Sequence, residues 1–231
     1  MVNTRIKEPQ AVLFDMDGLM VESEPLHFEA YKRVLGEWGH TLELETYFLF
    51  WGSDIDMSER MARAFNTVIS HEEICMRKNA VFREVFIHQV TAQKGLLKLL
   101  KRLQENRYLL AVVSSSQLSD IETILKAINA AAFFTEIISA EAVENGKPAP
   151  DCYLRAAEKL NVAPSRCLVL EDSPRGVLAA KRAGMKCYAI PSRGFEEADF
   201  DAADKIVKSL DEVWTLLKER DKSHVSRDDM L

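Results

Sequence analysis

The residues best suited to chemistry in this chain are four carboxylates, a hydroxyl and an ammonium group, spread over four places along the sequence. They are Asp15, Asp17, Ser114, Lys147, Glu171 and Asp172. If folding brings them together, the carboxylates repel one another severely unless a cation lies among them. Ligands that are all oxygen suit a hard divalent ion, and Mg2+ accepts a few carboxylates together with water and a substrate phosphate. The set therefore predicts a Mg2+ site.

Two other cation- or phosphate-binding motifs do not fit the residues around these groups. An EF-hand calcium loop that starts at Asp15 would need an oxygen ligand where Leu19 stands and a glycine where Met20 stands. The dipeptide Gly146-Lys147 has no glycine five residues before it, so it does not form a P-loop, and GxGxxG is absent from the sequence. The first acidic pair alone would be weak evidence, because such pairs also occur in solvated turns. The other groups of the set give it weight.

Each cluster of polar residues follows an apolar run that is typical of a buried parallel strand. These runs are Ala11–Phe14 before Asp15, Leu109–Val113 before Ser114, and Cys167–Leu170 before Glu171. Shorter candidate strands are Glu136–Ile138, Tyr188–Ile190 and Lys205–Val207. Ligands of an open parallel sheet bind at the carboxyl ends of its strands, which is where the polar clusters fall.

Amphipathic helical patterns separate these candidate strands. They cover Leu96–Leu103, Ile121–Ile128, Tyr153–Leu160 and Val177–Ala183. The second is predicted to begin at Ser119, with Glu122 completing a capping box. Strands that alternate with helices predict the α/β class, with a doubly wound parallel sheet.

The stretch from Leu26 to Ala92 breaks this alternation, because it holds three helical patterns in a row and no convincing strand. The patterns cover Phe28–Trp38, Met57–Val68 and Ile74–Val85, the last after a capping box at Ser70. We interpret residues 26–92 as an all-helical cap domain inserted into an α/β core formed by residues 1–25 and 93–231. The charged tail after Lys218 lacks an apolar face and is expected to fray.

The composition is that of an ordinary globular protein and argues against several other classes. The 231 residues are 47% hydrophobic and 29% charged, and the net charge of -6 comes from mixed residues without a basic stripe for nucleic acid. No apolar run approaches the roughly 20 residues of a bilayer span, and residues 1–10 lack the apolar core of a signal peptide. We expect a cytoplasmic protein without a nucleic-acid or membrane partner. Four well-separated cysteines are expected to be buried reduced thiols: Cys75, Cys152, Cys167 and Cys187.

The polar clusters also resemble, in order and over nearly the whole chain, the four motifs of the haloacid dehalogenase (HAD) superfamily. The matching segments are Phe14-Asp15-Met16-Asp17-Gly18, Val113-Ser114, Gly146-Lys147-Pro148-Ala149-Pro150-Asp151 and Leu170-Glu171-Asp172-Ser173. The helical insert after the first motif resembles the C1 cap of the subfamily that contains β-phosphoglucomutase, phosphoglycolate phosphatase and the sugar-phosphate phosphatases.

The resemblance implies a role for each motif residue. Asp15 would be the nucleophile that forms an aspartyl-phosphate, and Asp17 would be the general acid and base, which a dehalogenase would not need. Ser114 and Lys147 would hold the phosphoryl oxygens. Mg2+ would be held by Asp15, the carbonyl of Asp17 and Asp172, with Glu171 close by or linked through water. Ser115 and Ser116, which follow Ser114, are expected to contact the substrate.

Three residues of the insert are predicted to bind substrate by the same resemblance. His27 resembles a first-helix histidine that helps couple cap closure to positioning of the acid/base, and Lys78 resembles a cap lysine that meets substrate. Gly52 is the glycine of the cap loop Trp51-Gly52-Ser53-Asp54-Ile55. The alternatives are a structural histidine and a lysine on a solvated helical face. Nearby aromatic residues either line the cap pocket or pack inside the insert, namely Phe48, Phe50 and Trp51.

The favoured function is Mg2+-dependent hydrolysis of a small phosphorylated metabolite, such as a sugar or polyol phosphate. The first alternative is a β-phosphoglucomutase-type mutase, which would carry a cap arginine about three residues after Gly52 to grip a second phosphate. This chain has Ile55 there, with Asp54 and Asp56 beside it. The second alternative is a phosphoglycolate phosphatase. A non-catalytic binding module would have a broken motif, and none is broken. A capped site is complete within one chain, so we expect a monomer.

Overall fold

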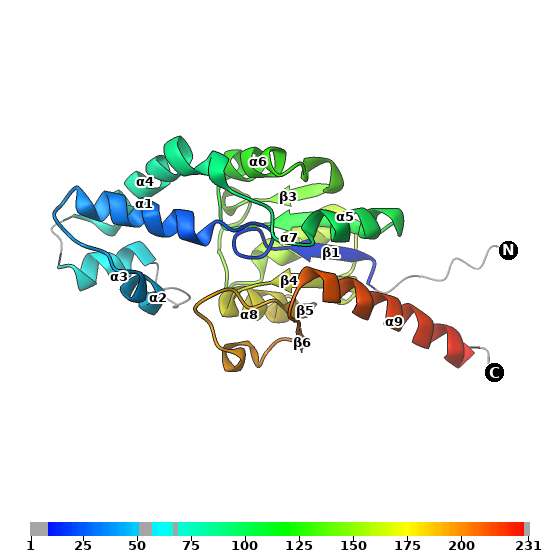
Figure 1. Ribbon diagram of the computed structural model, residues 1–231. Helices are drawn as coiled ribbons and strands as arrows, with labels where there is room; N and C mark the ends of the chain where they lie inside the picture. Colours follow the sequence, from blue (N-terminus) through cyan, green and yellow to red (C-terminus); the bar gives the residue numbers. More distant parts are fainter. Residues whose placement is uncertain (1–8, 51–56, 67–68, 229–231) are drawn as a thin grey trace.

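A computed structural model describes residues 9–50, 57–66 and 69–228 (Figure 1). Its centre is a parallel six-stranded sheet with the order β3-β2-β1-β4-β5-β6. The strands are β1 (Ala11–Phe14), β2 (Leu109–Val113), β3 (Glu136–Ile138), β4 (Cys167–Glu171), β5 (Lys186–Ala189) and β6 (Lys205–Ile206). The strand order reverses direction at β1, which lies between β2 and β4. The predicted α/β class and parallel sheet are confirmed.

Alternate residues of β1 pack on opposite faces of the sheet. Val12 and Phe14 belong to one hydrophobic cluster, and Ala11 and Leu13 belong to another. Helices α5 (Leu96–Glu105), α6 (Leu118–Ala127) and α9 (Leu210–Asp228) contribute to the first cluster, and α7 (Asp151–Leu160) and α8 (Pro174–Arg182) to the second. The strand is fully buried because helices cover both faces, which explains its continuous apolar sequence. The sheet is therefore doubly wound.

The register of the central strands determines which polar residues meet. Phe14 lies opposite both Val112 and Leu170, so the chain leaves β1, β2 and β4 at the same edge of the sheet. Parallel strands present their carboxyl ends together, and Asp15 and Glu171 therefore emerge side by side.

Two local predictions are wrong. Helix α6 begins at Leu118, with Gln117 at its N-cap and no side-chain cap, because the Gln117 carbonyl already accepts the amides of Asp120 and Ile121. The tail after Lys218 continues as helix α9 to Asp228. Leu217, fully buried in the core, anchors this helix, and extending an existing helix costs much less than starting one.

A group of helices, here called the helical insert (residues 24–86), lies between β1 and α5 and extends beyond one end of the sheet (Figure 1). It contains α1 (Glu24–Gly36), α2 (Leu44–Phe50), α3 (Met57–Ala64), α4 (His71–Val81) and the π-helical turn η1 (Phe82–Phe86). The predicted cap at Ser70 is confirmed, since its hydroxyl accepts from the Glu73 amide at 3.2 Å. Helix α2 was missed in the sequence, and the third predicted helix ends four residues early, in the π-helical turn.

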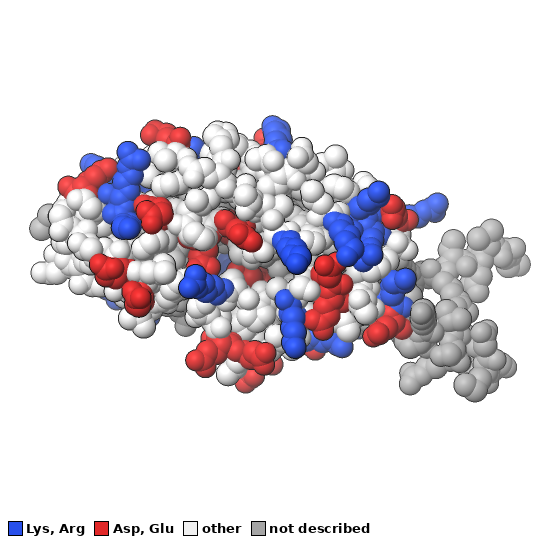
Figure 2. All heavy atoms as spheres, viewed as in Figure 1, with Lys and Arg blue, Asp and Glu red and all other residues white. Residues whose placement is uncertain are grey.

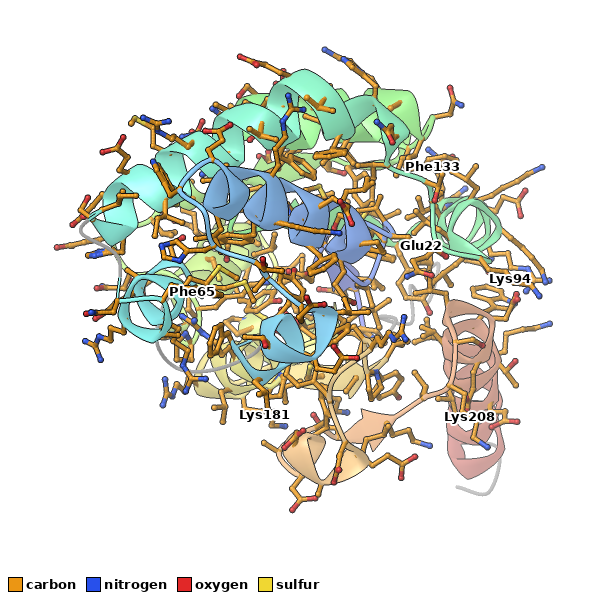
Figure 3. All side chains as sticks on the ribbon, turned by 60° about the vertical axis from the view of Figure 1, so that its left-hand side comes forward. Glu22, Phe65, Lys94, Phe133, Lys181 and Lys208 are labelled. Carbon is orange, nitrogen blue, oxygen red and sulfur yellow. The ribbon has the colours of Figure 1, made fainter. Side chains whose placement is uncertain are left out.

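The helical insert has a hydrophobic cluster of its own, separate from the two that cover the sheet. Its buried members are Tyr31, Leu35, Leu42, Tyr47, Met61 and Ile74. Phe65, labelled in Figure 3 where the insert comes forward, packs against this cluster. The insert thus has enough apolar contact to hold its own helices together.

Surface charge, helix polarity and the state of the cysteines are the remaining general features of the fold. On the face drawn in Figure 2, basic and acidic side chains are interspersed. Through the described part of the chain, each helix is too short or too polar to cross a bilayer. All four cysteines are free thiols, as predicted, although Cys75 is only half-buried and lines the cleft described below.

A glycine at the start of α8 leaves room for a buried carboxylate. The side chain of Ser173 caps the helix by accepting from the Gly176 amide at 3.2 Å. A Cβ added to Gly176 would lie 1.7 Å from Oε1 of Glu171. Glu171 is fully buried, so neither group can move away freely.

We predict that Gly176→Ala lowers the free energy of unfolding by about 1–3 kcal/mol, the usual cost of overpacking. Urea denaturation measures this loss. Gly36→Ala is the matched control, because a Cβ at this other helical glycine meets nothing within 4 Å and alanine favours helix. A Gly176→Ala protein as stable as the control would contradict the prediction.

Candidate active site

A cleft of about 450 Å³ lies at the carboxyl ends of the strands, between the sheet and the helical insert. Nine of the residues predicted from the sequence line it: Asp15, Asp17, His27, Lys78, Ser114, Ser115, Ser116, Lys147 and Asp172. Glu171 lies behind this lining, fully buried. Gly52 and its loop, including Trp51 and Ile55, lie outside the described residues. Folding therefore gathers the predicted groups from both the sheet and the insert.

The Lys147 ammonium group joins two of the buried carboxylates. Nζ donates to Oδ1 of Asp15 at 2.5 Å, to Oε1 of Glu171 at 2.6 Å and to the Val113 carbonyl at 3.2 Å. Burial disfavours a charged lysine, but the charges of Asp15 and Glu171 outweigh burial and raise the pKa of Lys147. This lysine stays protonated and fixes the position of the Asp15 carboxylate.

Glu171 is held by hydrogen bonds at both of its oxygens. Oε1 accepts from Lys147 and from the Tyr153 hydroxyl at 2.7 Å. Oε2 accepts from the amide of Asp172 at 3.1 Å and from the amide and hydroxyl of Ser173 at 3.2 and 3.0 Å. Such a carboxylate is well satisfied without solvent, which explains how a charged group is tolerated with no exposed surface.

The acidic cluster is short of positive charge. Burial raises the pKa of Asp15 to about 8 against the opposing charge of Lys147, and burial with the charges of Asp15 and Glu171 raises the pKa of Asp172 well above its usual value. Asp15, Glu171 and Asp172 each offer an oxygen, and these oxygens lie within 4.8 Å of one another. One lysine cannot balance three carboxylates. The cluster could therefore hold a hard divalent metal ion, with Asp15 and Asp172 facing the cleft.

Asp17 is held apart from this cluster by other partners. Its Oδ1 accepts from the Ser23 hydroxyl at 2.6 Å, and its Oδ2 accepts from the Ser116 hydroxyl at 3.0 Å. Nε2 of His27 lies 3.6 Å from Oδ1. Burial favours the neutral acid, but His27 and the two hydroxyls outweigh it and lower the pKa of Asp17 to about 2. In this arrangement Asp17 is ionised.

The His27 ring is fixed by stacking. It lies against the Phe82 ring, with centroids 4.2 Å apart and planes 22° apart. No partner among the described residues hydrogen-bonds to its buried Nδ1. Burial, followed by the nearby charge of Lys78, lowers the pKa of His27, so the ring is neutral near pH 7.

Ser114, Ser116 and Lys78 all line the cleft, but their side chains have different partners. Ser114 is buried, and its Oγ accepts from the Ser116 amide at 3.0 Å, while the Ser116 hydroxyl binds Asp17. Lys78 Nζ lies 5.3 Å from the centre of the Tyr31 ring and donates to Oδ1 of Asn79 at 3.1 Å. Lys78 thus lines the cleft from α4 rather than standing on a solvated face.

Sequence reasoning missed several residues of the site. Tyr153 was counted only as an apolar member of a helix, although its hydroxyl binds Glu171. Ser23, which binds Asp17, stands at the start of α1 and carried the ordinary signal of a helix cap. Arg83 and Asp120, which pair across the cleft, had no signal, because their 37-residue separation in the chain reveals nothing of their contact.

Comparisons with a protein family, with curated proteins and with solved structures all relate this chain to phosphate-processing proteins of one family. Residues 12–190 match the family described as Haloacid dehalogenase-like hydrolase. The chain is 33% identical over 206 residues to a validoxylamine A 7'-phosphate phosphatase of Streptomyces hygroscopicus subsp. limoneus, covering 88% of this chain and 95% of that protein. It is 30% identical over 217 residues to a phosphorylated carbohydrates phosphatase of Thermotoga maritima, covering 91% and 99%. The crystal structure of a putative beta-phosphoglucomutase from Thermotoga maritima superposes with a TM-score of 0.73 at 31% identity, covering 91% and 99%.

We predict that the stability of the metal-free protein falls, relative to Asp172→Asn, as the pH rises from 5 to 8. With a raised native pKa, Asp172 keeps its proton in the folded state after the unfolded chain has lost it, so folding weakens as pH rises. The free energy of unfolding should therefore fall more between pH 5 and pH 8 for the wild type than for Asp172→Asn. Urea denaturation in EDTA at the two pH values measures it, and parallel curves would contradict the raised pKa.

We also predict that Mg2+ stabilises the wild type but not Asp172→Asn. An ion that binds only the folded state at a hundred times its dissociation constant adds about 2.7 kcal/mol. Thermal unfolding with and without Mg2+ measures the effect. Glu122→Gln, which neutralises an exposed carboxylate of α6, is the control and should respond like the wild type. Equal stabilisation of Asp172→Asn would place the ion elsewhere.

Proposed function

Because the chain belongs to the haloacid dehalogenase-like hydrolase family, we propose that it is a Mg2+-dependent phosphatase of small phosphorylated metabolites, with sugar or polyol phosphates as its substrates. The observation that carries this proposal is the pairing of Lys147 with Asp15 in a cleft that Asp17 and Asp172 also line. The names of two relatives, a validoxylamine A 7'-phosphate phosphatase and a phosphorylated carbohydrates phosphatase, support the substrate class.

Asp15 is the proposed nucleophile. An oxygen of its carboxylate attacks phosphorus in line, the bond from phosphorus to the ester oxygen breaks, and an aspartyl-phosphate forms. A water oxygen then attacks the same phosphorus, the aspartyl bond to phosphorus breaks, and inorganic phosphate leaves with the carboxylate restored. The bond that Lys147 donates to Oδ1 holds this carboxylate in place between the two steps.

Asp17 is the proposed general acid and base. It gives its proton to the departing ester oxygen and takes one from the water that attacks in the second step. The carboxylate is ionised in the present arrangement, with a pKa of about 2. A phosphate dianion beside it favours the protonated acid, so substrate binding prepares Asp17 for the first transfer.

The phosphoryl oxygens need positive charge and hydrogen-bond donors. Lys147, from the turn before α7, and the Ser114 hydroxyl, which follows β2, are proposed to supply them, and Ser115 also lines the cleft. Asp15, Asp172 and the carbonyl of Asp17 would hold Mg2+, with Glu171 behind them. The ion, when bound, would neutralise the charge that builds up on the transferred group.

The helical insert is proposed to act as a cap over this site. It makes up most of a proposed cap domain of residues 26–92, distinct from the core of 1–25 and 93–231. Its own hydrophobic cluster supports this division, and so do His27 and Lys78, which it contributes to the cleft. A cap that closes would exclude water and complete the site around the leaving group.

Hydrolysis is preferred to a mutase reaction. A mutase must hold the outer phosphate of a bisphosphate, and the sequence has Ile55, flanked by Asp54 and Asp56, where an arginine would be needed. The 31% identity to a putative beta-phosphoglucomutase keeps that reaction as the second candidate.

We predict that the protein releases inorganic phosphate from one or more members of a panel of sugar, polyol and small-acid phosphates in Mg2+. Asp15→Asn should lower this rate by about a thousandfold or more, because it removes the nucleophile. Asp211→Asn is the matched control, since it neutralises an aspartate that is also paired with a lysine, Lys98, but far from the cleft.

The same assay distinguishes the two candidates. Phosphoglycolate in the panel tests the remaining substrate class. No phosphate release from any ester, together with isomerisation of glucose 1-phosphate that depends on a bisphosphate primer, would replace the phosphatase proposal with the mutase.

A further inference from the structure

The π-helical turn η1 (Phe82–Phe86) is where the helical insert contacts the core beside Asp17. Helix α4 runs toward α6 on the same side of the molecule and passes into η1 (Figure 1). π-helical turns are rare and occur frequently at functional sites. In this turn two consecutive residues, Phe82 and Arg83, both line the cleft.

Arg83 ties this turn to helix α6 of the core. Its Nε donates to Oδ1 of Asp120 at 2.7 Å, and a terminal nitrogen donates to Oε1 of Gln117. Asp120 has an exposed fraction of 14%, so its charge is partly shielded from water. Hydrogen bonding to Asp120 raises the pKa of Arg83, in accord with a charged pair. The planar guanidinium fork reaches both acceptors at once and fixes a direction as well as a distance.

Phe82, the neighbour of Arg83, sets the position of His27. A histidine ring is usually oriented by a hydrogen bond from its second nitrogen, but Nδ1 of His27 has no such partner among the described residues. The Phe82 ring, stacked at 4.2 Å, therefore determines the plane of the imidazole. Nε2 on that ring is 3.6 Å from Oδ1 of Asp17.

These contacts form a continuous path from the core through the insert and back to the acid/base. We propose that Arg83 is a positioning residue for proton transfer, because its bonds to Gln117 and Asp120 hold η1 where Phe82 keeps His27 beside Asp17. This inference rests on the proposed phosphatase function. It adds that the placement of His27 beside Asp17 depends on a polar contact between insert and core that the four sequence motifs do not contain.

A role in stability alone is a weak explanation for this ion pair. Arg83 has an exposed fraction of 37%, and ion pairs of that exposure contribute little to the free energy of unfolding. The pair formed by Lys98 and Asp211 has the same 2.7 Å separation and joins α5 to α9 away from the cleft. It provides a control for whatever stability such a pair supplies.

The test uses two esters of nearly the same shape, phenyl phosphate and para-nitrophenyl phosphate. The para-nitrophenolate ion leaves without a proton, whereas phenolate benefits from a general acid. The ratio kcat/KM reports the step in which the leaving group departs. Arg83→Gln should lower kcat/KM for phenyl phosphate by about tenfold or more, and for para-nitrophenyl phosphate by less than about threefold.

Three further variants separate positioning from a general loss of structure. Arg83→Lys keeps the charge opposite Asp120 and should recover part of the loss. Asp120→Asn should show the same selective loss, and the double variant should be no worse than either single one, because both break one contact. Lys98→Gln should leave kcat/KM unchanged for both esters. Hydrogen exchange of the Phe82–Phe86 amides should be faster in Arg83→Gln than in Lys98→Gln.

Equal losses on the two esters, or none, in Arg83→Gln would overturn the positioning role while leaving the phosphatase proposal intact. Additive losses in the double variant would overturn the shared contact. A wild-type protein inactive on these two esters and on the whole metabolite panel would instead overturn the proposed function, and the inference about Arg83 would fall with it.

Discussion

Three carboxylates lie close to one buried ammonium group, and the surrounding residues stabilise this concentration of charge. Lys147 bridges Asp15 and Glu171, and Asp172 completes the cluster. Burying that much charge is costly unless each group finds partners. Glu171 obtains them from Tyr153, Ser173 and the backbone, so its charge is satisfied within the protein. Burial, followed by the charges of neighbouring carboxylates, raises the pKa values of Asp15 and Asp172, and Lys147 alone does not offset this effect.

The fold brings these groups together through strand register. Because β1 pairs with β2 and β4 in parallel, the residues that follow the three strands emerge at one edge. Two glycines also leave room for the buried carboxylates. The loop after β1 passes so close to Asp172 that a Cβ on Gly18 would lie 2.0 Å from Oδ2. Gly176 leaves similar room for Glu171. Glycine is required at both places because the carboxylates occupy the volume of any side chain.

The helical insert contacts the core on two sides of the cleft. On one side, Arg83 binds α6 through Asp120. On the other, Arg193 of the loop after β5 lies 5.6 Å from the centre of the Phe48 ring of α2. Gly194 has no side chain, which leaves room for that ring, since an added Cβ would lie 2.7 Å from Cδ1 of Phe48. These two polar contacts add to the apolar packing of Ala30 and Phe82, which belong to the first hydrophobic cluster of the sheet. Proton transfer and substrate binding can depend in this way on contacts distant from Asp15.

The sequence by itself determined the sheet, the helical insert and the polar residues of the strand ends, because these are written in local pattern: apolar runs of four or five residues, helical spacing and short motifs. It could not determine which hydrogen-bond and ion-pair partners those polar residues have in the folded protein. Tyr153 donates to Glu171, Ser116 donates to Asp17, and Arg83 binds Asp120. In each of these pairs the two residues are distant along the chain. Only tertiary structure decides such contacts, because hydrogen bonds and burial depend on distances in space, and so does the pKa of each buried group.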